Sequence, residues 1–214
     1  MKVLTIANRK GGAGKSTCAA HLAVAATNSG LKAILIDMDP QKTLEGWWQK
    51  RVEDTPLLVE TTAVDLPNSI DKLRTQGFDI CIIDTPGDSG DFTRAGIMAA
   101  DLVIIPSKPT PPDLSAIGRT ISLVEENKKK FAFVITQGIV RTKATLQALS
   151  VLSQFGAVAP APISNRTAYA SAMGAGKSAG DFDKIVEEEI NQVWEFIKDT
   201  LFKSEKITKK KLIA

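Results

Sequence analysis

The chain has 214 residues and a formal net charge of +3, with 43% hydrophobic and 24% charged residues. A chain of this length can bury one substantial hydrophobic core and is too short for two full-sized domains. It contains no run of roughly 18 apolar residues, as a membrane span needs, and its N-terminus lacks the pattern of a secretory signal. We therefore expect a soluble, cytoplasmic protein.

Short apolar runs alternate with longer helical patterns along the chain. Strands are expected at residues 3–7, 33–37, 57–60, 79–84, 102–106, 131–136 and about 157–163. Helices are expected at 15–29, 41–52, 66–76, 91–100, 112–129 and 142–155, and a last one from about Asp181, which could cap it, to Phe202. The nearly continuous apolar strands indicate an α/β fold with a doubly wound, mostly parallel sheet flanked by helices. We expect one domain over residues 1–203 and a basic tail over 204–214.

The two cysteines and the single histidine do not suggest a metal centre. Cys18 and Cys81 lie in apolar segments without CxxC or Cys/His spacing. We interpret them as buried structural thiols, and His21 as a residue on a helix face without a catalytic role.

The pentapeptide GAGKS occurs twice, at residues 12–16 and 174–178. The first copy follows an apolar strand and opens a helix, so that backbone N–H groups and the helix N-terminus would face a phosphate group. The second copy follows a helical pattern, and no strand precedes it. We expect it to be a polar turn between two helices, which leaves one nucleotide per chain.

The first copy departs from the common phosphate-loop pattern, because Arg9 stands where the first glycine is usual and Lys10 follows it. The resulting K-G-G-A-G-K-S motif resembles that of the ParA/MinD family of deviant Walker ATPases. Further similar segments are LIDMDPQ (35–41), CIIDTPG (81–87), IIPSKPTPPDLSA (104–116) and PISNRTAYASAM (162–173). The resemblance covers most of residues 1–185, is nearest to the short plasmid-partition ParA-like proteins, and implies a P-loop NTPase fold.

The motifs supply candidate residues for ATP and Mg²⁺. Lys15 is expected to contact the β- and γ-phosphates, and Ser16 to coordinate Mg²⁺. Asp37 and Asp84 end neighbouring strands and suit the metal site, while the resemblance implies that Asp39 orients the attacking water. For each aspartate the alternative is helix capping or turn formation. The other expected nucleotide contacts are Gly11, Gly12, Ala13, Gly14, Thr17, Gln137 and Pro162, with adenine near Thr136, Gln137 and the loop 162–165.

Lys10 has the most distinctive expected role. Its backbone would wrap the phosphates, so its side chain would point away from them. In the resembled family this lysine reaches the nucleotide of a partner subunit and acts there as an arginine finger does. The resemblance therefore implies a homodimer that forms on ATP binding; the alternative is a surface lysine without such a role.

The C-terminal segment 198–214 carries six lysines against Asp199 and Glu205. Its apolar residues form no strong stripe, so we do not expect membrane binding. A solvated tail is one interpretation, and sequence-independent contact with DNA phosphates is the functional one. The candidate contacts are Lys198, Lys203, Lys206, Lys209, Lys210 and Lys211, with Arg166 and Lys184.

These observations predict a ParA-like partition ATPase that binds Mg²⁺–ATP, dimerises, and associates non-specifically with nucleoid DNA. An adaptor or centromere-binding protein would stimulate its slow hydrolysis. Two alternatives stay open: a positioning ATPase for another cargo, such as a protein compartment, a chemoreceptor array or a conjugation complex, and a metabolic P-loop enzyme of the same fold.

Overall fold

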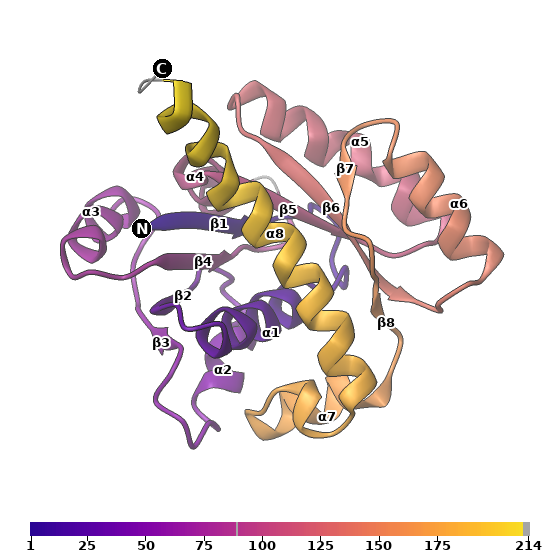
Figure 1. The fold of residues 1–214 in the computed structure, drawn as a ribbon, viewed down its shortest axis with the longest axis horizontal. Helices are drawn as coiled ribbons and strands as arrows, with labels where there is room; N and C mark the ends of the chain where they lie inside the picture. Colours follow the sequence, from indigo (N-terminus) through magenta and orange to yellow (C-terminus); the bar gives the residue numbers. More distant parts are fainter. Residues whose placement is uncertain (89, 212–214) are drawn as a thin grey trace.

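The computed structural model describes residues 1–88 and 90–211, with side chains described as far as Phe202. An eight-stranded sheet lies at its centre, in the order β3-β2-β4-β1-β5-β6-β7, with β8 paired to β6 (Figure 1). All pairings are parallel. The strands are β1 (Lys2–Ile6), β2 (Ala33–Asp37), β3 (Leu57–Leu58), β4 (Ile80–Asp84), β5 (Leu102–Ser107), β6 (Phe131–Gly138), β7 (Ala157–Val158) and β8 (Ile163–Ser164).

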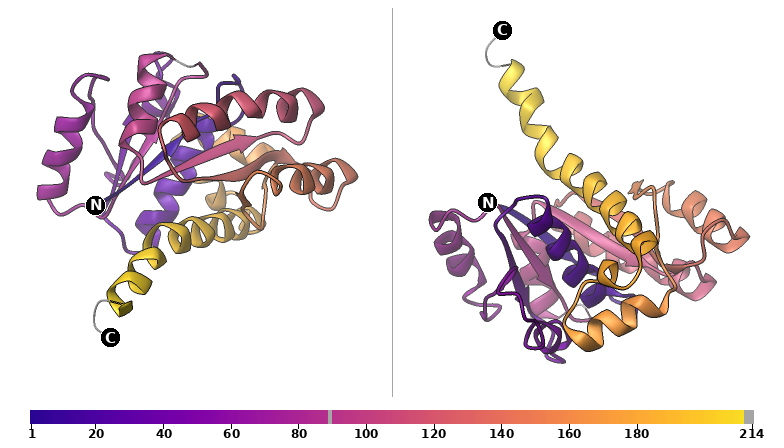
Figure 2. Two further views of the ribbon diagram at one scale, coloured as in Figure 1. Left: turned by 90° about the horizontal axis from the view of Figure 1, so that it is seen from above. Right: turned by 60° about the horizontal axis from the view of Figure 1, so that its bottom comes forward.

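Helices cover both faces of this sheet, as the continuous apolar strands predict. The helices are α1 (Lys15–Asn28), α2 (Thr43–Trp48), α3 (Leu66–Thr75), α4 (Asp91–Ala99), α5 (Pro111–Glu126), α6 (Lys143–Leu152), α7 (Thr167–Ala175), the 3₁₀ turn η1 (Ala179–Asp181) and α8 (Lys184–Lys211). The core of one face gathers residues of α1, α2, α7 and α8, and the cores of the other face gather residues of α3 to α6. Figure 2 shows α8 and α3 on opposite sides of the sheet. The predicted α/β fold is confirmed.

Helix α1 is buried nearly all round because α8 crosses its outer side (Figure 1). Trp194 of α8 donates from Nε1 to the Ser29 hydroxyl at the end of α1, at 3.1 Å. Small residues on α1, such as Ala19 and Ala23, allow it to lie between the sheet and α8. The helix that begins at the phosphate loop is therefore fixed on two sides.

The last helix differs from the expectation at both ends. It begins at Lys184, because Asp183 accepts the first free N–H group, from Ile185, at 2.9 Å. Asp181 does not cap this helix; its carboxylate accepts from Ser178 N at 3.0 Å and closes a capping box on η1. The backbone then continues as a helix to Lys211, through most of the predicted tail.

The expected strand near 157–163 is two short strands, β7 and β8, with different places on β6. Pro160 and Pro162 lie between them. Proline has no N–H group for the ladder, so a continuous strand cannot form there. The strand expected at 57–60 likewise pairs only over Leu57–Leu58. No helix in the described part of the chain is long and apolar enough to cross a membrane.

Candidate nucleotide-binding site

The loop between β1 and α1 has the geometry of a phosphate loop. Gly12 and Gly14 adopt φ values of +71° and +86°, which side chains other than glycine rarely tolerate. The loop is fixed from β6, because Thr136 donates from its hydroxyl to Ala13 O at 2.8 Å and Gln137 donates from its amide to Gly12 O at 3.3 Å. Within the described residues no side chain caps α1, so its first N–H groups remain free for an anion.

A cavity of about 610 Å³ opens over this loop. It brings together most of the predicted phosphate and catalytic residues with the turn after β4. Its lining includes Gly11, Gly12, Gly14, Lys15, Ser16, Thr17, Asp39, Gln137, Pro86, Gly87 and Asp88. Ala13 is fully buried beneath it. At Gly87 a Cβ would lie 3.2 Å from Gly11 N and 3.3 Å from Lys15 Nζ, so this turn meets the phosphate loop closely.

A second cavity, of about 330 Å³, adjoins the first and shares Gly14, Thr17 and Gln137 with it. Its wall is mainly apolar and comes from β6, β8 and α7, with Thr136, Ile163, Asn165, Tyr169 and Met173 among its residues. Pro162 stands one residue before this lining. A flat heterocyclic base suits such a cavity, which adjoins the phosphate loop where the sequence places adenine.

Asp84 ends β4, where the ends of β1, β2 and β4 meet in register, and it interacts with Ser16 and Lys15, which line the phosphate cavity. It is fully buried, and neither carboxylate oxygen has a hydrogen-bond partner of normal geometry among the described residues. Burial raises its pKa to about 7, against the influence of the Ser16 hydroxyl, and the charge of Asp37 raises it further. Two unpartnered buried oxygens beside a hydroxyl fit a Mg²⁺ site, since this ion prefers oxygen ligands.

Asp37 is differently engaged. Its two oxygens accept from the backbone N–H groups of Asp39, at 3.0 Å, and Glu45, at 2.9 Å. Burial raises its pKa, and these two bonds act against that shift. Asp37 therefore bonds the first turn of α2, and Asp39 stands at the cavity with one oxygen that closes a turn by accepting from Gln41 N.

Lys10 lies outside the phosphate cavity and makes an ion pair with an unexpected partner. Its Nζ lies 2.8 Å from Asp113 Oδ2; the Lys10 side chain is 34% exposed and that of Asp113 is 6% exposed. Asp113 stands in the first turn of α5, where Thr110 also binds its carboxylate. Burial pushes the Asp113 pKa up, but Lys10, Thr110 and the charge of Lys108 outweigh it and hold the pKa below its usual value.

Sequence reasoning missed Asp113 and Lys108 as site residues. Lys108 Nζ would lie 3.7 Å from a Cβ on Gly12, so a second cation stands beside the phosphate loop. Both residues belong to the segment SKPTPPDLSA, and an acid in the first turn after a proline-rich stretch was the available signal. Their distance from the loop in sequence, about a hundred residues, hid the contact.

The second GAGKS copy is a turn between α7 and η1, as predicted. Gly176 ends α7 with φ +68°. Its carbonyl accepts from Arg51 Nη1 at 3.1 Å, and the Lys177 carbonyl accepts from Trp47 Nε1 at 3.0 Å. This copy joins α7 to the end of α2 through carbonyl groups and offers no N–H cradle for phosphate.

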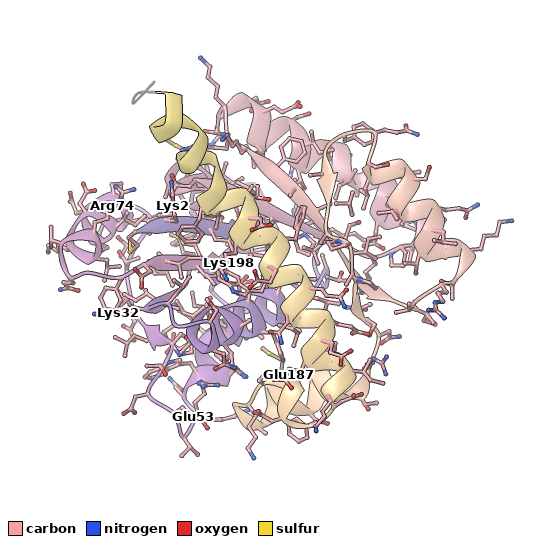
Figure 3. The ribbon with its side chains drawn as sticks, viewed as in Figure 1. Lys2, Lys32, Glu53, Arg74, Glu187 and Lys198 are labelled. Carbon is pink, nitrogen blue, oxygen red and sulfur yellow. The ribbon has the colours of Figure 1, made fainter. Side chains whose placement is uncertain are left out.

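The candidate DNA contacts are only partly described. Arg166 binds Glu189 and Asp183, at 3.3 and 3.6 Å, so its charge is largely matched within the chain. Lys198 lies on α8 and pairs with Glu195 at 2.9 Å (Figure 3), and Lys184 is exposed at the start of the same helix. The side chains of Lys203, Lys206, Lys209, Lys210 and Lys211 lie outside the described part.

With this geometry in place, the chain can be assigned to a class. Its residues 4–178 match the family described as the CobQ/CobB/MinD/ParA nucleotide binding domain, and the chain belongs to that family. It is thus a P-loop nucleotide-binding protein of the ParA/MinD kind, and the expected family is confirmed.

The chain is also similar to particular proteins and to a solved structure. The chain is 29% identical over 202 residues to "Maintenance of carboxysome distribution protein A" of Halothiobacillus neapolitanus, covering 89% of this chain and 93% of that protein. It is 28% identical over 144 residues to "Protein ParA" of Rhizobium radiobacter, covering 66% and 64%. Among solved structures, cobyrinic acid a,c-diamide synthase from Mycobacterium smegmatis, with a bound ATP analog and magnesium, superposes with a TM-score of 0.76 at 20% identity, covering 93% and 94%.

Proposed function

We propose that this chain is a ParA-like ATPase that positions a cargo by cycling between ATP- and ADP-bound states. It binds Mg²⁺–ATP, closes with a second copy into a face-to-face dimer, and holds DNA without sequence preference. An adaptor or centromere-binding protein stimulates its slow hydrolysis. The observation that carries the proposal is the position of Lys10, beside the phosphate loop yet directed out of its cavity.

The proposed roles follow from the site. Lys15 and the N–H groups of residues 11–17 bind the phosphates, and Gln137 adjoins the base cavity. Ser16 and Asp84 would hold Mg²⁺, which neutralises phosphate charge when bound, and Asp37 supports that site by fixing the turn through Asp39. Asp39, at the cavity wall, orients the attacking water.

Lys10 has two alternative partners in this proposal: Asp113 of its own chain and the nucleotide of a second chain. In the single chain the ammonium pairs with one carboxylate. The triphosphate of a second chain offers more negative charge than that carboxylate, so it competes for Lys10. The exchange from Asp113 to the partner's nucleotide would link dimerisation to ATP.

The DNA surface is proposed at the end of the molecule where α8 leaves the sheet. A cavity of about 300 Å³ there is lined by four lysines against one acid, Asp101, together with Thr200 and Leu201 of α8; the lysines are Lys2, Lys128, Lys129 and Lys130. Figure 3 places Lys2 near the distal part of α8. These lysines, absent from the candidates named from the sequence, add to the basic C-terminal segment, and a dimer would double the positive charge.

The proposal is tested by the oligomeric state. Size-exclusion chromatography with light scattering is run with ATP, with ADP and without nucleotide on the wild type, Lys10→Ala and the distant surface control Lys32→Ala. We expect a dimer only with ATP, and only for the wild type and the control. A monomer under all conditions, or an ATP-dependent dimer of Lys10→Ala, would contradict it.

Two cargoes are candidates. Plasmid DNA is the first, from the likeness to the short partition proteins. A protein compartment is the second, favoured by the 29% identity, over nearly the whole chain, to a protein named for carboxysome distribution. A plasmid-retention assay in cells lacking the gene, read beside the distribution of labelled compartments, separates the two.

A further inference from the structure

Glu189 is an acidic residue buried in the middle of the fold, away from the phosphates. It stands on α8, and its side chain is 9% exposed. Burying a carboxylate is unfavourable unless charged or hydrogen-bonding partners compensate it. The partners of Glu189 therefore indicate what it holds in place.

All of these partners belong to one segment, residues 164–169. Ser164 donates to Glu189 Oε2 from its hydroxyl at 2.5 Å and from its backbone N–H at 3.4 Å. Tyr169 donates its hydroxyl to the same oxygen at 3.4 Å. Arg166 donates from Nε and Nη2 to Oε1, each at 3.3 Å. One carboxylate on α8 thus binds three side chains and one backbone group of this segment.

The same three residues line the apolar cavity beside the phosphate loop, between β6 and α7. The backbone of this segment is also held to β6, by the two pairs of β8 and by Asn165 N, which donates to Gly138 O at 3.1 Å, and Tyr169 lies within α7. Ser164 is buried. Glu189 of α8 thus adds to these backbone contacts the bonds that hold the polar side chains of the cavity wall.

We propose that Glu189 is a positioning residue for the nucleotide base: it fixes the wall of the base cavity from α8 and does not touch the phosphates. This inference rests on the proposed function, since it takes the bound nucleotide to be ATP with its base in that cavity. It predicts that a change at Glu189 weakens only ligands that carry a base, because a ligand without a base does not contact the wall of the base cavity.

The test compares ATP with inorganic tripolyphosphate, which has the phosphates and no base. Isothermal titration calorimetry with Mg²⁺ measures both ligands on the wild type, Glu189→Gln and Glu188→Gln. Glu188 is the exposed neighbour on α8, so its variant has the same change of charge without the contacts. For Glu189→Gln we expect the ATP dissociation constant to rise about tenfold, the order of a lost charged hydrogen bond, and that of tripolyphosphate to change less than about twofold.

Ser164→Ala provides a second variant that leaves Glu189 in place. It removes the 2.5 Å bond and should weaken the binding of ATP without weakening that of tripolyphosphate. In the double variant Ser164→Ala/Glu189→Gln, the loss of ATP binding free energy should be smaller than the sum of the two single losses. The inference is overturned if Glu189→Gln leaves ATP binding unchanged, or weakens ATP and tripolyphosphate equally. If instead the wild type binds tripolyphosphate but not ATP, the proposed function fails as well.

Discussion

The two GAGKS copies have identical residues and opposite surroundings. The copy at 12–16 opens α1 after a strand, so that the free N–H groups of a helix start face a cavity. The copy at 174–178 ends α7, where backbone carbonyl groups lack partners within the helix. The side chains of Trp47 and Arg51 donate hydrogen bonds to two of these carbonyl groups. A helix start attracts anions and a helix end repels them. The element that precedes a glycine-rich pentapeptide therefore decides whether the pentapeptide can bind phosphate.

The largest effect should separate the two lysines of these copies. Lys15→Ala removes an ammonium group from the phosphate cavity, and we expect ATP affinity to fall by about a hundredfold or more, since bonds to charged groups are worth the most. Lys177→Ala changes an exposed residue and should leave ATP affinity within about twofold. Calorimetric titration measures the ATP affinity of both variants. Equal losses of affinity would show that the two copies do not differ in phosphate binding.

The glycines of the second copy should affect stability and not phosphate binding. At Gly176, with φ +68°, a Cβ would lie 2.4 Å from the backbone carbon of Lys50. Gly176→Ala should therefore lower the free energy of unfolding by about 3 kcal/mol, as overpacking does. At Gly174 a Cβ meets no described atom within 4 Å, so Gly174→Ala is the matched control. Urea unfolding measures the stability of the two variants. Similar unfolding midpoints would contradict the close packing of Gly176 against Lys50.

The two helices next to these copies, α1 and α7, also meet in a contact that should depend on pH. His21 of α1 meets Tyr169 of α7 edge to face, with 5.1 Å between ring centroids, and its Nδ1 donates to Thr17 O at 2.8 Å. Burial lowers the His21 pKa to about 4, against the Thr17 bond, which raises it. The unfolded chain, with a pKa of about 6.5, binds the proton first as pH falls. The contribution of His21 to the free energy of unfolding is therefore fully present above pH 6.5 and declines toward pH 4, by at most about 1.4 kcal/mol per pH unit.

His21→Gln serves as the non-titrating comparison for this decline. Urea unfolding of the wild type and the variant is measured from pH 7 to 4.5. The difference between their slopes should match the loss of one proton site, and parallel curves would show that His21 does not titrate as described.

The smallest effect should come from Asp113, which holds Lys10 inside the single chain. Because the Lys10 side chain is one-third exposed, water screens this pair, and its worth is at most about 1 kcal/mol. Both chains of the dimer release a Lys10, so Asp113→Asn should tighten the ATP-dependent dimer by at most about fivefold for each chain, or roughly thirtyfold in its dissociation constant, as read by analytical ultracentrifugation. The gain should vanish in Lys10→Ala/Asp113→Asn; the same gain in both backgrounds would mean that Asp113 does not act through Lys10.

Features that depend on the order of neighbouring residues could be predicted from the sequence. Buried strands, the phosphate loop and Asp84 at a strand end all follow from apolar runs and motif spacing, and the structure has them in one place. The start of α8 was misplaced because Asp181 and Asp183 are both suitable caps, and only the fold decides between them.

Contacts between distant segments could not be predicted in this way. Asp113 lies about a hundred residues from Lys10, and Glu189 lies twenty or more from the groups that it binds. Helical spacing from Val186 and Val193 puts Glu189 on the buried face of α8 and Glu188 on the exposed one, but no local pattern indicates which groups Glu189 binds. Partners of this kind become visible only when tertiary packing places one helix over another.

The proposed exchange of Lys10 from Asp113 to a second chain's ATP can be seen in a crystal structure of the protein with a non-hydrolysable ATP analogue. We expect two chains face to face, with each Lys10 ammonium parted from Asp113 and in hydrogen-bond distance of the other chain's terminal phosphate. A loaded chain with Lys10 still paired to Asp113, and no second chain across its phosphate loop, would contradict it.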